Sequence, residues 1–323
     1  MDAAGRFNQG MRILSPAVAW LAVALLGCGG EPGRTSAAAD QAGPRAQTPA
    51  EAPSGPALES DAGLVWVPGG RVELGGGDER FPERLGIEVE LPGFWIEATE
   101  VTNRRFAQFV EATGFVTDAE RFGDSVVFQF ETGAWALVAG ACWRRPSGAG
   151  SDWRELEDHP VVQVSLRDAQ AYAAWAGRRL PSEAEWELAA RGGLVRAPFA
   201  WGSVHLPAGA PPANVWQGLF PAEDLGLDGF RGSAPVARFA ANGLGLYDLA
   251  GNVWEWVDTP RGSGPLAALH ERRGPLTEAG LDAQIRGGSF LCAPNYCQGY
   301  RPSARQFKRP DEASNNLGFR CAR

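Results

Sequence analysis

The chain has 323 residues, a formal net charge of -8 and a hydrophobic content of 44%. Gly (42) and Pro (24) are frequent enough to exclude a helical bundle or coiled coil, and they favour short elements joined by ordered loops. The hydrophobic content is sufficient for a sizeable packed core. The diffuse acidic charge argues against nucleic acid as a partner. Lys308 is the one lysine among 30 basic residues, a bias that the composition does not link to any function.

The first 27 residues are typical of an export signal. Residues 13–27 form an uncharged, Ala- and Leu-rich stretch, which is shorter than the roughly 20 residues that a membrane-spanning helix needs. The stretch leads into Leu-Leu-Gly-Cys28, which resembles a bacterial lipobox, where the signal is cut before a Cys that is then lipidated. We expect residues 1–27 to be a lipoprotein signal peptide, Cys28 to carry the lipid, and the protein to be exported and lipid-anchored to the bacterial cell envelope. An ordinary signal, or a buried Cys after a short helix, stays an open alternative.

Residues 28–62 begin with this Cys and continue as an Ala-, Pro- and Gly-rich segment with almost no large apolar side chain. Such a segment cannot offset the entropy of ordering by burial, so we expect a disordered tether. From residue 63 onward the composition is that of a globular protein, with no internal repeat and no second linker. We therefore expect residues 63–323 to be a single, loop-rich α+β domain.

Hydrophobic periodicity and capping residues predict seven elements in this domain. In chain order they are strands at 64–70 and 87–91, helices that begin after Thr102, Ser165 and Ser182, and strands near 253–257 and 285–290. The third helix has the clearest start, because Glu185 completes a capping box with Ser182. The first helix places Phe106, Phe109 and Val110 on one face.

The usual catalytic motifs are missing from the sequence. The three histidines, His159, His205 and His270, are far apart and lack the spacing of metal ligands. There is no HExxH or CxxC pair, no phosphate-binding GxxxxGK[ST] loop and no GxSxG nucleophile elbow. Zinc, nucleotide and serine-hydrolase chemistry are therefore disfavoured.

Cysteine is the residue type that carries a candidate chemistry. Cys292 and Cys297 are five positions apart with a proline between them, so they can meet across a tight loop. Two close thiols in an exported protein can form a structural disulfide, bind a soft ion such as Cu(I), or carry out redox chemistry. Spacing alone leaves these three alternatives open.

The domain resembles the formylglycine-generating enzyme (sulfatase-modifying factor) family over nearly all of residues 64–323. The motifs that carry the resemblance are VPGG at 67–70, EVTN at 100–103, RFGDS at 121–125, DHPV at 158–161, LPSEAEWE at 180–187, PFAWG at 198–202, NVWQG at 214–218, NGLGLY at 242–247, GNVWEW at 251–256, RGGSFLCAPNYC at 286–297 and NLGFRC at 316–321. Most of them are shared with a wider superfamily that has non-catalytic members. The cysteine pair after Gly-Gly-Ser is the feature that points to catalysis.

The resemblance implies a loop-rich fold of the C-type-lectin-like type and an oxidase that uses O2 and Cu(I). The substrate would be an unfolded or flexible sulfatase polypeptide, whose Cys in a Cys-x-Pro-x-Arg motif becomes Cα-formylglycine. Cys292 and Cys297 would be the catalytic copper thiolates. The implied neighbours are Ser289, Trp254, Tyr296 and Asn316 as lining residues, and Asp124 and Ser125 as substrate contacts.

The resemblance also implies bound Ca2+, which takes oxygen ligands. The matching positions are Asn214, Val215, Asp228 and Phe230 for one ion, and Asp248, Gly251, Val253 and Glu255 for a second. Two disulfides of the animal enzymes have no counterpart here, because the matching positions pair Ala173 with Cys321 and Ala190 with Pro302. We expect Cys142 and Cys321 to be buried, free thiols.

A second hypothesis comes from a different class of protein. The same fold could serve as a tethered binding or scaffold module in which Cys292 and Cys297 form a structural disulfide. A third hypothesis is an oxidase that acts on another thiol substrate.

Overall fold

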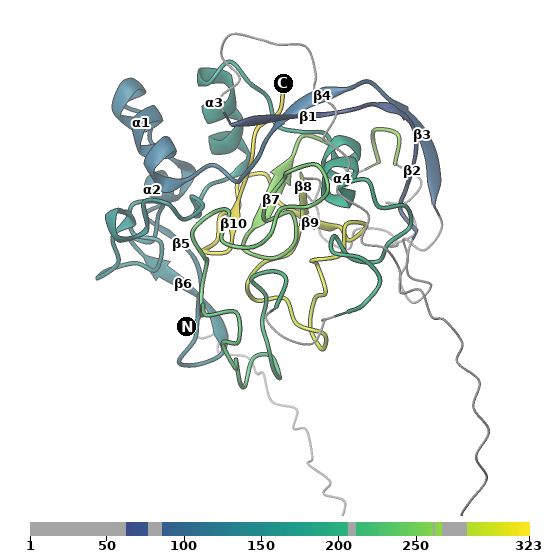
Figure 1. Ribbon diagram of the computed structural model, residues 1–323. Coiled ribbons are helices and arrows are strands. Elements are labelled where there is room, and N and C mark those ends of the chain that lie inside the picture. The colour runs from purple at the N-terminus through teal and green to yellow at the C-terminus, as the bar shows by residue number, and fades with distance from the viewer. Residues whose placement is uncertain (1–62, 77–85, 206–210, 261, 267–282) are drawn as a thin grey trace, which may run out of the picture. The chain divides into compact units, whose positions relative to one another are not determined.

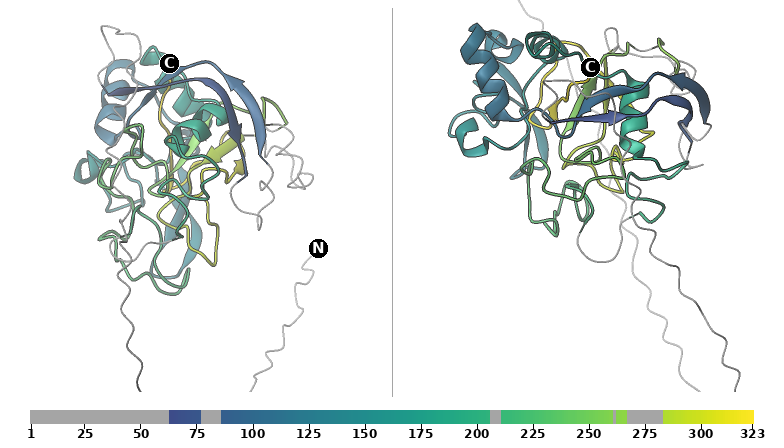
Figure 2. Two further views of the ribbon diagram at one scale, coloured as in Figure 1. Left: turned by 45° about the vertical axis from the view of Figure 1, so that its right-hand side comes forward. Right: turned by 45° about the horizontal axis from the view of Figure 1, so that its top comes forward.

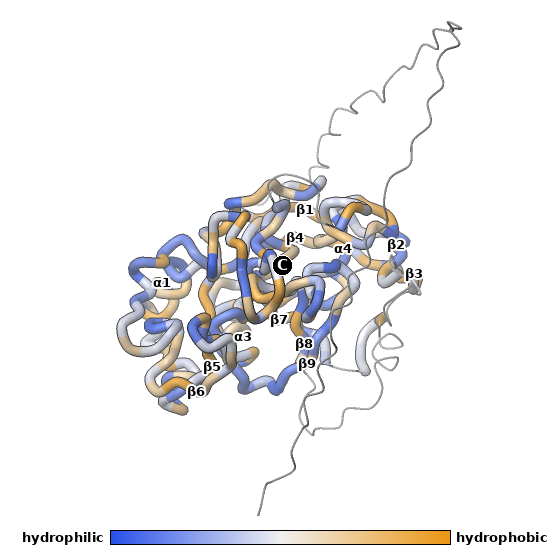
Figure 3. The backbone as a smooth tube through the Cα atoms, turned by 90° about the horizontal axis from the view of Figure 1, so that it is seen from below, coloured by the Kyte–Doolittle hydropathy of each residue, from blue (hydrophilic) through white to orange (hydrophobic). Residues whose placement is uncertain are grey.

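The structure is a computed structural model that describes residues 63–76, 86–205, 211–260, 262–266 and 283–323. The predicted signal peptide, the lipidated Cys28 and the tether lie outside the described residues, as does His270. Within the described part no helix is long and apolar enough to cross a bilayer. Figure 3 agrees with this, because hydrophobic stretches along the tube are short and alternate with hydrophilic ones.

A mixed four-stranded sheet lies at the centre of the described chain (Figure 1). It has the order β10-β7-β8-β9, from β7 (Trp254–Val257), β8 (Ala283–Arg286), β9 (Gln306–Lys308) and β10 (Leu317–Gly318). The pair β10–β7 is parallel and the other two pairs are antiparallel. As a result the start of β7, the end of β8, the start of β9 and the start of β10 meet at one edge of the sheet.

Three antiparallel two-stranded ribbons surround the central sheet. They are β1 (Leu64–Val67) with β4 (Phe94–Glu97), β2 (Gly70–Leu74) with β3 (Ile87–Leu91), and β5 (Asp124–Gln129) with β6 (Ala134–Ala139). The helices are α1 (Asn103–Thr113), α2 (Asp118–Phe122), α3 (Leu166–Trp175) and α4 (Glu183–Arg191), with a short 3₁₀ helix at Trp153–Leu156. Figures 1 and 2 place α1, α2 and the β5–β6 hairpin to one side of the central sheet, and α4 with the β2–β3 ribbon to the other.

The predicted helix starts are confirmed. Thr102, Ser165 and Ser182 are the N-caps of α1, α3 and α4. At α4 the Glu185 backbone N–H donates to Ser182 Oγ at 3.3 Å, and the Ser182 N–H donates to Glu185 Oε2 at 2.8 Å. Because both ends of the capping box are satisfied, this helix has a fixed starting point.

The last predicted strand, at 285–290, is wrong beyond Arg286. Gly287 and Gly288 have φ values of 91° and 75°, which a regular strand does not allow, so β8 ends at Arg286. The helix α2 and the β5–β6 hairpin were not predicted. Both are too short or too irregular in pattern to stand out from the surrounding loops.

The largest group of buried apolar residues joins α1 and α3 to the central sheet. Phe106 of α1 stacks on Tyr172 of α3 with ring centroids 5.8 Å apart, and it also meets Phe319 edge-on at 6.4 Å. Cys321 lies in the same core, and both it and Cys142 are buried and free, as expected. Apolar side chains therefore surround Cys321, and no disulfide holds it in place.

Candidate active site

A disulfide joins Cys292 and Cys297, whose Cα atoms are 5.2 Å apart. Cys292 is fully buried, whereas Cys297 is partly exposed and faces a cavity of about 150 Å³. The cavity is lined by Trp135, Trp254, Ser289, Leu291, Tyr296, Cys297, Gln306, Lys308 and Asn316. The four predicted lining residues, Ser289, Trp254, Tyr296 and Asn316, are thus brought together with the cysteine pair.

The edge of the central sheet positions this cavity. Trp254 is the first residue of β7, and its N–H donates to the carbonyl of Asn316, the residue before β10, at 2.9 Å. Arg286 ends β8 opposite Glu255, and the chain then turns through Gly287 and Gly288 to Ser289. Residues far apart in the sequence therefore meet because their strands end at the same edge.

Hydrogen bonds fix the orientation of the Ser289 hydroxyl. Ser289 Oγ accepts from Asn316 Nδ2 at 3.0 Å and from the Leu291 N–H at 3.3 Å. Asn316 is held in turn by the Ser314 hydroxyl, which donates to its Oδ1 at 2.8 Å. Because both acceptor positions of Ser289 are used, its own proton is available to donate to a group in the cavity.

The Gly-Gly-Ser turn requires glycine at Gly288. Its φ of +75° is unfavourable for other residues, and a Cβ would lie 2.6 Å from the Tyr300 nitrogen and 3.2 Å from Cys292 Sγ. At Gly299 a Cβ would lie 2.3 Å from the Trp254 ring. The backbone therefore packs directly against both the disulfide and the indole that line the site.

Aromatic side chains form the outer wall of the cavity. Tyr296 stacks on Phe220 with ring centroids 4.1 Å apart, and Trp135 meets Phe128 edge-on at 5.4 Å. Tyr296 is 52% exposed and Trp135 is 40% exposed, so both rings remain reachable from solvent. A polypeptide could contact these rings while one of its side chains enters the cavity.

The predicted substrate contacts lie outside this lining. Asp124 and Ser125 begin β5. Ser125 is buried, and its hydroxyl is placed to donate to Gln163 Oε1 at 2.5 Å or to the Ala313 carbonyl at 3.2 Å. These bonds tie β5 to neighbouring segments, and a role in substrate binding stays a prediction for both residues.

The first predicted calcium set is gathered around one carboxylate. Asp228 accepts from the backbone N–H of Val215 at 3.2 Å and from that of Phe230 at 2.9 Å. Asn214, the residue before Val215, donates from Nδ2 to the Gly232 carbonyl at 2.9 Å. Burial raises the pKa of Asp228, and no ion pair to it occurs among the described residues. An additional cation would relieve this uncompensated charge.

The second predicted calcium set lies in a region of excess negative charge. Both oxygens of Glu255 accept from Arg320 at 2.7 Å. Two further carboxylates, Asp248 and Glu100, lie close together. Burial and then the neighbouring Asp248 charge raise the pKa of Glu100, and burial raises the pKa of Asp248 to about 6. One oxygen of Glu100 is buried without a hydrogen-bond partner in the described structure. Three carboxylates around the single guanidinium of Arg320 leave an excess of negative charge. A calcium ion held by Asp248 and Glu255, with backbone carbonyls of Gly251 and Val253 as co-ligands, stays a prediction.

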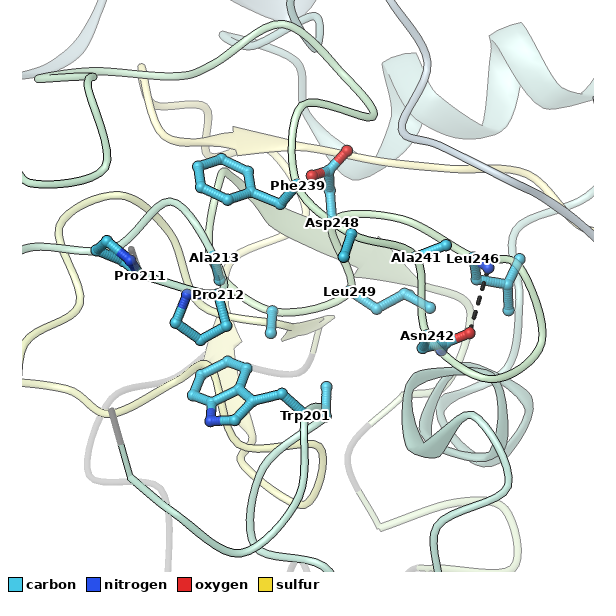
Figure 4. Close-up of a pocket in the computed structure, with 13 residues that line it drawn as sticks. Trp201, Pro211, Pro212, Ala213, Phe239, Ala241, Asn242, Leu246, Asp248 and Leu249 are labelled. Carbon is cyan, nitrogen blue, oxygen red and sulfur yellow. Dashed lines mark hydrogen bonds between the residues drawn. The ribbon is translucent and has the colours of Figure 1, made fainter. Parts of the chain in front are cut away.

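A larger cavity of about 340 Å³ lies elsewhere in the described chain. Figure 4 shows the rings of Trp201 and Phe239 on opposite sides of it, with prolines 211 and 212 at one end. Its lining contains Asp248 but neither of the paired cysteines. Volume alone would point to this cavity, whereas the chemistry points to the smaller one beside Cys297.

Sequence reasoning missed four residues of the active-site lining: Trp135, Leu291, Gln306 and Lys308. Trp135 lies in the hairpin that was not predicted, Leu291 lies in the loop between the Gly-Gly-Ser turn and the two cysteines, and Gln306 and Lys308 lie in β9, which has three residues. One feature of the sequence could have drawn attention to Lys308, because it is the single lysine of the chain.

Comparison with known proteins identifies the family. A family model for the sulfatase-modifying factor enzyme 1-like domain matches residues 49–323. The chain belongs to this family. A formylglycine-generating enzyme of Thermomonospora curvata is 46% identical over 284 residues, which cover 80% of this chain and 93% of that protein. The fold of the sulfatase-modifying factor family also occurs in PvdO from Pseudomonas aeruginosa, with a TM-score of 0.58 at 26% identity, covering 80% of this chain and 93% of PvdO.

Membership of the sulfatase-modifying factor family and the similarity to PvdO confirm the predicted loop-rich α+β fold. Membership does not by itself establish activity, since a mouse protein named inactive C-alpha-formylglycine-generating enzyme 2 is 40% identical over 282 residues, 81% of this chain and 86% of that protein. Within the described residues no group of three or more His, Cys, Asp or Glu side chains is placed to hold a metal ion. The cysteine pair and its cavity therefore carry the functional argument.

Proposed function

We propose that this protein is a copper-dependent, O2-using oxidase that converts the Cys of a Cys-x-Pro-x-Arg sulfatase motif to Cα-formylglycine. The observation that carries the proposal is a cysteine pair at the wall of a cavity with room for one small side chain. The relatives named formylglycine-generating enzyme support the choice of reaction. A purely structural cross-link would have no need of a cavity at its partly exposed sulfur.

The donor set fits Cu(I). When reduced, Cys292 and Cys297 supply two soft thiolates from neighbouring positions, and no histidine or carboxylate lines the described cavity to favour a harder ion. Cu(I) bound there would supply the means of activating O2. The substrate thiol, entering the same cavity, would come next to both sulfurs.

The protein's own groups orient the substrate and exclude water. The Ser289 proton is free to donate to a polar atom in the cavity, and the Asn316 amide holds the hydroxyl in that direction. Trp254 closes the inner wall and is buried, while Tyr296 covers the outer side. These side chains would restrict the substrate cysteine to one orientation.

The proposed conversion needs electrons in addition to O2. The thiol-bearing methylene carbon of the substrate becomes an aldehyde and releases its sulfur as hydrogen sulfide, which is a two-electron oxidation. Full reduction of O2 to water takes four electrons, so two electrons and two protons must come from two external thiol groups, which join as a disulfide. The Cys292–Cys297 disulfide is then the resting state of the enzyme, and external thiol can reduce it.

The test uses the full-chain protein, reduced and loaded with Cu(I), in air. A peptide with the Cys-x-Pro-x-Arg motif is added and its mass is followed. Loss of the cysteine sulfur and appearance of an aldehyde that reacts with a hydrazine supports the proposal. An unchanged peptide in the presence of bound copper would mean that this oxidase reaction is absent.

We expect a mild reductant to raise the activity of protein isolated in air. The reductant opens the Cys292–Cys297 disulfide and supplies the electrons that O2 requires. The measurement compares the peptide conversion rate with and without dithiothreitol at constant copper. A lower rate after mild reduction, with copper still bound, would contradict this expectation.

Calcium at the two oxygen-rich sites is part of the proposal. Chelation by EGTA is expected to lower the melting temperature by about 5–10 °C, as loss of a ligand held at about 100 times its Kd would do. Added CaCl2 should restore it. The matched variants Asp228→Ala and Asp248→Ala, which remove the oxygen ligand, identify which site contributes, and a melting temperature that EGTA leaves unchanged would exclude both.

We also propose that the enzyme is tethered to the cell envelope through Cys28 and meets sulfatase chains as they emerge after export. The lipobox-like sequence and the long, apolar-poor segment before the domain support this location. Metabolic labelling with a lipid analogue should mark the wild type and leave Cys28→Ala unmarked. An unlabelled wild type would remove the anchor from the proposal.

A further inference from the structure

One formal charge lies in the wall of the active-site cavity. Among the described residues that line it, Lys308 alone is ionic at neutral pH, because the others are aromatic, apolar, hydroxyl or amide side chains and Cys297 is held in the disulfide. The same lining contains no carboxylate. The cavity is therefore cationic within a protein whose net charge is -8.

The register of β9 directs Lys308 to this position. β9 pairs with β8 so that Ala283 lies opposite Lys308 and Ile285 lies opposite Gln306. Alternate residues of a strand share a face, so Gln306 and Lys308 both line the cavity while Phe307 between them does not. Gln306 lies near the sheet edge that places Ser289 and Asn316, and Lys308 lies two residues further along the same strand face.

Lys308 is only loosely held by its partner. Its Nζ donates to Glu312 Oε2 at 3.3 Å, and the two side chains are 28% and 34% exposed. An ion pair that open to water is weak, so a second carboxylate can share or replace Glu312. Glu312 does not line the cavity, so the charged group that lines it is the ammonium of Lys308 and not the carboxylate of its partner.

The identity of the residue is informative as well. All other basic residues of the chain, apart from its three histidines, are arginines. A compact ammonium on a flexible stem replaces the planar guanidinium at this one position. Such a group suits a small cavity and a contact with a single charge.

We propose that Lys308 makes the enzyme select polypeptides with an acidic residue next to the reacting cysteine. The inference rests on the proposed function for the identity of the substrate. A cavity of about 150 Å³ takes one small side chain, so the residues flanking the cysteine stay outside it and can meet the Lys308 side chain, which lines the cavity and is 28% exposed. A carboxylate there gains an ionic contact, whereas a basic residue is repelled.

The test measures binding without copper or turnover. Pairs of Cys-x-Pro-x-Arg peptides carry Glu or Gln immediately before or immediately after the cysteine, and Ser replaces the cysteine itself. Affinity for the full-chain protein is followed by tryptophan fluorescence at low salt. The Glu peptide of at least one pair should bind about two- to fivefold more tightly. Lys308→Arg should keep this ratio, Lys308→Met should bring it to about one, and Lys308→Glu should invert it.

The outcomes separate this inference from the proposed function. Equal binding of Glu and Gln peptides by the native protein overturns the role of Lys308, as does a preference that persists in Lys308→Met. A Lys308-dependent preference combined with unoxidised cysteine peptides would uphold the acidic selectivity and remove the oxidase reaction. Thermal unfolding of each variant shows that a lost preference does not come from a lost fold.

Discussion

Cys297→Ser is expected to lower the rate of formylglycine formation more than about a thousandfold, as loss of a group that contacts the reacting atoms does. The same change should lower the free energy of unfolding by only about 2 kcal/mol, because the disulfide closes a loop of a few residues and removes little entropy from the unfolded chain. Cys292→Ser should behave in the same way. The measurement combines peptide conversion by mass spectrometry with urea unfolding.

The matched control is Cys142→Ala, which removes a buried, free thiol that lies outside the cavity lining. This variant should keep its activity. If Cys297→Ser lost stability but formed formylglycine at the native rate, the cysteine pair would be a structural cross-link. The tethered scaffold hypothesis would then replace the oxidase.

Glu187→Gln is expected to lower the free energy of unfolding by about 3–5 kcal/mol, the range seen when one member of a buried ionic cluster is removed. Glu187 is fully buried and bonds to Arg191 at 2.6 Å, Arg286 at 2.8 Å and Arg305 at 3.0 Å. Burial opposes its charge, yet these three arginines hold its pKa well below the usual range. Without the carboxylate, Arg286 and Arg305 would keep Glu183 as their acidic partner among the described residues of the cluster, and Arg191 would lose its ion pair.

Urea unfolding followed by tryptophan fluorescence measures this change, with Glu88→Gln as the control. Glu88 also pairs with an arginine, Arg71, but the two side chains are 60% and 75% exposed. Its loss should cost less than about 1 kcal/mol. A similarly small effect for Glu187→Gln would mean that the buried cluster contributes no more than a surface pair. Arg286 ends β8 just before the Gly-Gly-Ser turn. The loss of its ionic partner in Glu187→Gln should therefore also lower the rate of formylglycine formation.

Local signals in the sequence predicted the helix starts and the cysteine pair. Thr102, Ser165 and Ser182 could be identified because an N-cap bonds to a backbone group three residues away, so its whole signal is contained in the sequence. The proximity of Cys292 and Cys297 followed from a separation of five residues. These features depend on chain neighbours and require no tertiary information.

Features that depend on distant pairing could not be predicted. Glu187 appeared as one residue of a helix, but its partners Arg286 and Arg305 are 99 and 118 positions away. Lys308 reaches the cavity because β9 pairs with β8, and a strand of three residues has too little periodicity to show that pairing. The boundary of β8 was misjudged because Gly287 and Gly288 turn the chain between Ile285 and Phe290.

The contacts of residues 321–323 have a consequence for biosynthesis. Cys321 and Ala322 are fully buried, Ala322 bridges to Ile96 and Arg179, and Arg323 exchanges backbone hydrogen bonds with Trp95 at 2.8 and 3.1 Å. These residues therefore complete contacts begun by some of the first residues of the domain. The domain cannot complete its core until residues 321–323 have left the ribosome, because β4 otherwise lacks the backbone partner that these residues provide. For the export proposed above, this delay would keep the newly made chain unfolded for longer.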